Sequence, residues 1–229
     1  MEPESATLGA AVETYLRSRP RLIRWMEWLR GRRYVLAPLG GRSPLVVIAY
    51  SFRDARAARQ VALAVEEEWP RVPELSRAAY TEILSLAPEL IVVQLRRDNV
   101  CGCLAHRHVL VREGPFAEPH EAFGGAPIGE MDIAAGRVEA WQALPLTDTA
   151  FDARFLEGSR LEEFHARQLR LKLLSILLHE TNHLVFPHEP ESSVRERSLA
   201  FYRAALADYV ASTMQTLSLT IDRSFSRLG

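Results

Sequence analysis

Cysteine is almost absent from this chain of 229 residues, which has two, Cys101 and Cys103, separated by one residue. Two cysteines at that spacing do not make the disulfide framework of a small secreted protein, so a reducing cytoplasm is the expected setting. The first residues lack the basic start and apolar run of a signal peptide. No apolar run approaches the roughly 18 residues of a membrane span. We therefore expect a soluble, cytoplasmic protein that does not contact a membrane.

Net charge is also nearly absent, because 28 basic residues balance 29 acidic ones to give −1. That balance argues against a nucleic-acid-binding or membrane-surface protein that relies on bulk charge. Apolar residues make up 48% of the chain, enough for a sizeable core. The length fits one domain over residues 1–229, with a helical N-terminal elaboration over residues 1–40.

Short β-branched runs alternate with helical patterns in the first part of the chain, whereas the part after residue 155 is almost wholly helical. Strands are expected at 45–50, 90–95 and 109–112, with one or two edge strands between 131 and 141. Helices are expected at 8–30, 55–69 and 74–86. This segregation favours an α+β fold in which a mixed sheet packs on a helical core.

The most informative segment is a long helical pattern over residues 161–186, which Pro187 ends. Apolar side chains cover most of its circumference, so the helix should be buried. One narrow polar stripe consists of Gln168, Lys172, Ser175, His179 and His183. Two imidazoles one turn apart can both reach one zinc ion at about 2.0–2.1 Å. The stripe therefore predicts a site for one zinc ion per chain, with a surface, capping or structural use of the two histidines as the competing interpretation.

Glu180 lies to the side of the histidine pair, where a carboxylate can act on a metal-activated water rather than bind the metal. The segment 177–185, LLHETNHLV, resembles the active-site helix of zincin metallopeptidases. The resemblance implies that His179 and His183 are zinc ligands, that Glu180 is the general base, and that the substrate is a protein or peptide. It also implies a mixed sheet above this helix, whose edge strand, sought between residues 131 and 141, aligns the substrate.

A third ligand is needed, because catalytic zinc usually takes three protein ligands and one water. The metzincin spacing is broken, since Phe186 and Glu189 stand where that family has glycine and histidine. A glutamate on the following helix, as in gluzincins, is the other arrangement. Glu191 is the preferred ligand, with Glu196, Glu189 and His188 as alternates.

The following helix carries further candidates and, with its predecessor, would form the catalytic helices over residues 155–215. Ser192 or Ser193 can cap it, and Glu196 then completes a capping box. Three side chains are candidates for an oxyanion donor or for orienting a ligand histidine, with ordinary packing as the competing interpretation. They are Tyr202, Tyr209 and Asp208.

Other segments allow different interpretations. Cys101, Cys103, His106 and His108 could form a second metal site, or a turn with a small thiol followed by strand histidines, since their spacing fits no common zinc module. Residues 46–54 are similar to the opening of a TIR domain, although no position matches that family's catalytic glutamate. The run Glu66 to Glu68 is expected to be a solvated helix face.

The sequence thus predicts a gluzincin-like zinc metallopeptidase whose subfamily stays open. With no evident propeptide, narrow specificity, a closed cleft or a regulatory partner must restrain it, so limited, regulatory proteolysis is expected. The alternatives are a non-catalytic interaction module with a zincin-like fold, and a zinc hydrolase that acts on a non-peptide amide.

Overall fold

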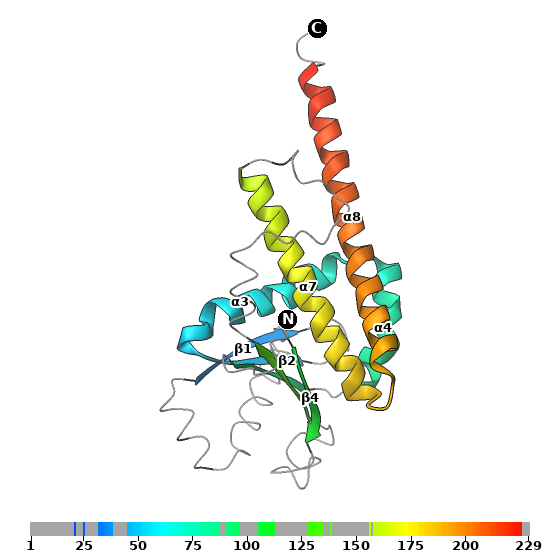
Figure 1. Cartoon of the computed structure of the whole chain (residues 1–229). Helices are drawn as coiled ribbons and strands as arrows, with labels where there is room; N and C mark the ends of the chain where they lie inside the picture. The colour runs from blue at the N-terminus through cyan, green and yellow to red at the C-terminus, as the bar shows by residue number, and fades with distance from the viewer. Residues whose placement is uncertain are drawn as a thin grey trace, which may run out of the picture.

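The computed structural model describes residues 21, 25, 32–38, 45–87, 90–96, 105–112, 128–134, 138, 156 and 158–225. A five-stranded sheet lies at one end of the molecule, and two long helices, α7 (Ser159–Val185) and α8 (Glu191–Phe225), run side by side away from it (Figure 1). This arrangement is consistent with the α+β class expected from the sequence. None of the helices in the described ranges is both long and apolar enough to cross a membrane.

The sheet is mixed, and its strands follow the order β1-β2-β3-β5-β4. Three parallel strands form its centre: β2 (Leu45–Ser51), β3 (Leu90–Arg96) and β5 (Ile128–Ala134). The edge strands β1 (Arg32–Pro38) and β4 (Ala105–Arg112) run antiparallel to their neighbours. The residues Val46 to Ala49 and Ile91 to Val93 are fully buried, because parallel strands at the centre of a sheet are covered on both faces.

Two predictions for the edges of this sheet are wrong. The helical elaboration expected over residues 1–40 is wrong at residues 32–38, which form strand β1, where pairing with β2 outweighs the weak local pattern. Of residues 1–31, only 21 and 25 are described, and both are helical. The strand expected at an edge between 131 and 141 is β5, which lies between β3 and β4. Strand β4 forms that edge instead and begins before the expected residue 109. Of residues 135–141, only 138 is described.

Helices α3 (Ala55–Leu63) and α4 (Glu74–Leu86) connect β2 to β3, as the sequence predicts. Helix α3 packs on β1 and β2, and α4 packs on α7 and α8. Between them, the chain passes through a π-helical turn (Ala64–Glu68) and a 3-10 turn that contains Pro70. The connection therefore places one helix on the sheet and the other against the long helices.

The π-helical turn brings a glutamate into the core, contrary to the expectation of a solvated face. The side chain of Glu68 is fully buried. Arg167 Nε donates to its Oε2 at 2.9 Å, and Arg170 Nε donates to its Oε1 at 2.8 Å. Since both arginines belong to α7, these ion pairs fix the N-terminal half of α7 to the layer that covers the sheet.

Helix α7 is buried on most of its circumference, as its nearly continuous apolar pattern predicts. It follows Gly158, whose φ of 56° suits a residue without a Cβ. A turn then reverses the chain into α8, which begins at Glu191. The capping prediction for Ser192 or Ser193 is therefore wrong: the carbonyl of Pro190 already accepts the N–H of Ser193.

Candidate metal centre

The two histidines lie on the C-terminal half of α7, one turn apart, and face the start of α8. Their rings meet edge to face, with centroids 4.9 Å apart and planes at 71°. The side chain of His179 is 15% exposed and that of His183 is 18% exposed. A buried helix thus holds both rings firmly while their edges still reach solvent.

Glu191, the first residue of α8, places its carboxylate beside both rings. Its Oε2 lies 3.0 Å from Nε2 of His183, and its Oε1 lies 3.7 Å from Nε2 of His179. One ligand atom from each of the three residues lies within 4.8 Å of the others. Ligand atoms around a tetrahedral zinc ion with bonds of 2.0–2.1 Å are about 3.4 Å apart. The group can therefore hold a metal ion, and Glu191 is the glutamate that completes it.

Ser198 contacts the Nδ1 atom of His179, the ring nitrogen that does not face Glu191. Its Oγ lies 3.2 Å from Nδ1 of His179 and also donates to the carbonyl of Arg195 at 3.0 Å. A hydroxyl whose one hydrogen lies on that carbonyl can accept from Nδ1–H, which corresponds to the tautomer with a lone pair on Nε2. In that tautomer, the Nε2 lone pair and the Glu191 carboxylate, 3.7 Å away, are both available to a cation. A cation between them suits this donor set.

Glu180, the predicted general base, is 4% exposed and lies between the two histidines in the sequence. On a helix it is rotated by about 100° from His179 and about 60° from His183. The helix therefore projects Glu180 at an angle to both histidines, and burial shields its side chain from bulk water. Glu180 does not belong to the group formed by His179, His183 and Glu191.

The three alternate ligands lie elsewhere. Glu189 binds Arg197 and Asn182. Glu196 and His188 are exposed, and neither belongs to the group that Glu191 completes. Of these four neighbouring candidates, the turn and the start of α8 thus bring Glu191 alone beside the histidines.

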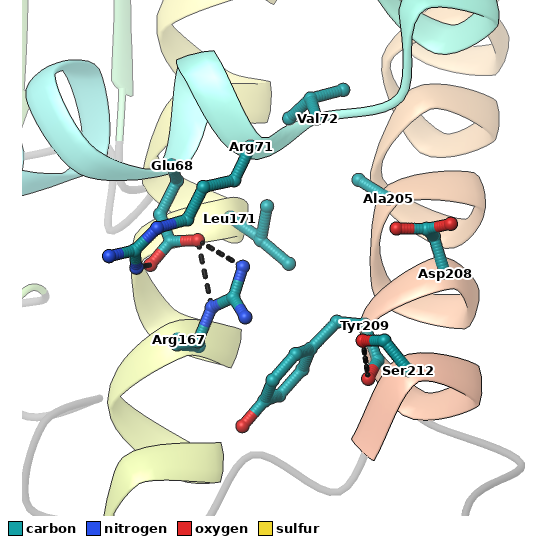
Figure 2. A pocket seen from close by; sticks show the side chains of 9 residues that line it. All are labelled: Glu68, Arg71, Val72, Arg167, Leu171, Ala205, Asp208, Tyr209 and Ser212. Atoms are coloured by element: carbon teal, nitrogen blue, oxygen red, sulfur yellow. Dashed lines mark hydrogen bonds and ion pairs between the residues drawn. The ribbon is translucent and has the colours of Figure 1, made fainter. Parts of the chain in front are cut away.

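Asp208 and Tyr209 lie far from the histidines. At 1.5 Å per residue, Asp208 is about 15 Å along α8 from Ser198. Both residues line a separate cavity of about 200 Å³ together with Glu68 and Arg167 (Figure 2). The guanidinium of Arg167 lies 4.0 Å from the Tyr209 ring centroid, and burial raises the pKa of that phenol. The roles predicted for these two residues at the metal are therefore not supported by their positions.

Tyr202 is 5% exposed and lies one helical turn beyond Ser198 on α8. It is thus the nearer of the two tyrosines to the histidines along the helix, and its oxyanion role stays a prediction. Among the members of the predicted second metal site, Cys101 and Cys103 lie outside the described residues. His106 and His108 belong to β4, where the described structure is limited to the backbone.

Sequence reasoning missed three side chains around the centre: Ser198, Asn182 and Arg197. A usable signal exists for Ser198, which follows Glu191 by seven residues and so shares its helix face. Asn182 and Arg197 had no such signal, because their contacts cross between α7, the turn and α8.

Comparisons with protein-family models, characterised proteins and solved structures found no match to this chain.

Proposed function

We propose that this protein is a zinc-dependent metallopeptidase of the gluzincin type. The observation that carries the proposal is the convergence of His179, His183 and Glu191. The buried Glu180 lies on α7, the helix that carries both histidines. Two imidazoles and one carboxylate form the ligand set that zinc takes in hydrolases, with the fourth position left for water. Calcium and magnesium prefer oxygen ligands throughout, so the two nitrogens favour zinc over either of them.

Zinc bound here would act as a Lewis acid that polarises a carbonyl and lowers the pKa of water to near 7. Glu180 would accept the proton of the attacking water and pass it to the leaving amine. Two observations support this role: Glu180 is buried, and it lies between the two histidines in the sequence of α7. Ser198 would hold His179 in the tautomer whose Nε2 can bind a metal.

The surrounding fold supports a peptide as substrate. Helix α7 packs against β4, the edge strand of a mixed sheet. In the proposed enzyme, β4 takes the substrate-aligning role that the resemblance assigned to a strand between 131 and 141. An extended peptide can add to an exposed edge strand through main-chain hydrogen bonds. We further propose that cleavage is limited and regulatory, that it takes place in the cytoplasm, and that a partner or narrow specificity restrains it.

Metal analysis of the purified chain, together with a Glu180→Gln variant, tests the proposal. We expect one zinc ion per chain in both proteins, and a fall in peptide-library cleavage of about 10²–10⁴-fold in the variant. Glu163→Gln, an exposed change on the same helix, is the matched control and should cleave normally. A chain that binds no zinc would exclude the proposal.

Two further outcomes distinguish the alternatives. A zinc-loaded protein that leaves peptides intact but hydrolyses members of a non-peptide amide library is an amidase. A zinc-loaded protein that hydrolyses neither library, and whose cellular role survives Glu180→Gln, is a non-catalytic module.

A further inference from the structure

At the turn between α7 and α8, three side chains form a closed hydrogen-bond network, which we call the turn clamp: Asn182, Glu189 and Arg197. Arg197 donates through Nη2 to Glu189 Oε1 at 2.7 Å and through Nη1 to Glu189 Oε2 at 3.0 Å. Nη1 also donates to Asn182 Oδ1, and Asn182 Nδ2 donates to Glu189 Oε2 at 2.6 Å. Asn182 is fully buried, so one member of the turn clamp is part of the protein core.

Each member of the turn clamp lies within two residues of a residue of the metal centre in the sequence. Asn182 precedes His183, Glu189 is separated from Glu191 by one proline, and Arg197 is next to the serine that holds His179. The clamp therefore joins α7, the turn and α8 at the points from which the ligands project. Backbone hydrogen bonds tie the same turn, with Phe186 N donating to Asn182 O at 2.7 Å.

The turn clamp also separates two similar carboxylates. Glu189 and Glu191 flank Pro190, and both belong to the short segment that passes the histidines. The bidentate guanidinium of Arg197 engages both oxygens of Glu189, a geometry that favours arginine over lysine. The Asn182 amide also donates to Glu189 Oε2, so both oxygens of Glu189 are occupied within the clamp. Glu189 is thus committed to the clamp, and Glu191 is left to face the rings.

The carboxylate of Glu191 contacts both histidine rings, with Oε2 at 3.0 Å from Nε2 of His183 and Oε1 at 3.7 Å from Nε2 of His179. The Glu191 side chain is 47% exposed, so its position also depends on where the backbone of the turn places it. We propose that Arg197 is a positioning residue of the metal centre: by locking Glu189 to Asn182 it sets the turn that presents the Glu191 carboxylate to the histidines. This inference rests on the metal site of the proposed function and adds the device that organises its third ligand.

Zinc affinity, measured by competition with a chromophoric chelator, tests this inference in a double-mutant cycle. Arg197→Met should weaken zinc binding by about 10–100-fold, the range found for residues that orient metal ligands. If Arg197 acts through Glu191, the same change in a Glu191→Ala background should alter the affinity by less than about twofold. Arg203→Met, an exposed change on α8, is the matched control and should leave affinity unchanged in both backgrounds.

Arg197→Lys keeps the charge but loses the planar fork, and serves as a second variant should Arg197→Met not fold. It should weaken zinc binding by about tenfold, again only when Glu191 is present. Thermal unfolding of each zinc-free protein measures any loss of stability separately from affinity. A purely structural role would weaken binding equally in both backgrounds, and that result, or unchanged affinity in the single variants, overturns the inference.

The wild-type measurement separates this inference from the proposal on which it depends. If the wild-type chain and the Arg197 variants bind zinc equally well, the turn clamp has no role in zinc binding, and the metallopeptidase proposal stays in place. A wild-type chain without zinc affinity removes both.

Discussion

The Nε2 atom of His183 lies 3.0 Å from the Oε2 atom of Glu191, although a helix end and a turn separate the two residues. The contact joins the last turn of α7 to the first residue of α8. It places a carboxylate beside two imidazoles that their helix already presents together. The candidate metal centre thus depends on one tertiary relationship added to one local helical spacing.

The identity of the third ligand can be tested by comparing two glutamates on the same helix. Glu191→Ala should weaken zinc binding by about 100-fold or more, because even residues outside the ligand set commonly cost 10–100-fold. Glu196→Ala should leave the affinity unchanged, since Glu196 is exposed and outside the ligand group. Competition with a chromophoric chelator measures both, and the opposite order of effects would make Glu196 the ligand.

Ser198 should contribute to zinc affinity without binding the metal. Ser198→Ala removes the hydroxyl that holds Nδ1 of His179, so the ring loses its preferred orientation and tautomer. We expect zinc binding about tenfold weaker, with the stoichiometry of one ion retained. Ser193→Ala, an exposed change at the start of the same helix, is the control. Equal zinc affinity in Ser198→Ala and Ser193→Ala would show that the contact between Ser198 and His179 does not contribute to zinc binding.

The buried glutamate of the π-helical turn should be important for stability. Glu68→Gln leaves Arg167 and Arg170 with a neutral partner, and loss of one member of a buried ion pair costs about 3 kcal/mol or more. Denaturant unfolding of the zinc-free protein should show that decrease. Glu66→Gln, an exposed change in the same turn, should alter stability by less than about 0.5 kcal/mol. Similar stabilities for the two variants would contradict the structural role.

The turn clamp should make stability depend on pH through Glu189. Its pKa is lowered below the ordinary 4.5, first by the hydrogen bonds from Arg197 and Asn182. The resulting stabilisation is fully present above about pH 4.5 and is lost as the pH falls through the lower pKa of the folded state. Zinc-free wild type should therefore exceed Glu189→Gln in stability at pH 6.

That difference should narrow as the pH is lowered below about 4.5 and Glu189 becomes protonated in the folded wild type. Urea unfolding of both proteins across this range measures the difference directly. A gap that stays constant down to the acid limit would indicate that the carboxylate charge contributes nothing to the clamp.

Much of the candidate centre was predictable from local pattern. Helix periodicity placed His179 and His183 on one face of a buried helix. Glu191 was preferred over later acidic residues because its surroundings resemble the glutamate-led second helix of small gluzincins, although the spacing here is shorter. The bounds of α4 and the central strands β2 and β3 also follow from contiguous local signals. Such signals are reliable where one segment alone decides which side chains share a face.

The misplaced elements share one cause. Strand β1 and the edge position of β4 depend on which strands pair, and pairing joins segments that are distant in the sequence. Glu68 was expected on a solvated face because the arginines that bury it come from α7, a hundred residues away. Asp208 was expected near the histidines, but the rise of α8 places it about 15 Å from Ser198 along the helix.

The sequence by itself determined a buried helix with two histidines one turn apart and a glutamate beside them, because these follow from the 3.6-residue period of a helix. Only the tertiary structure decided which nearby carboxylate meets the histidines, because the path of the turn and the grip of Arg197 on Glu189 arise from contacts between separate elements. The period of a helix fixes how side chains are oriented around its own axis. A metal centre built from two helices also depends on the distance between their axes, which local periodicity does not give.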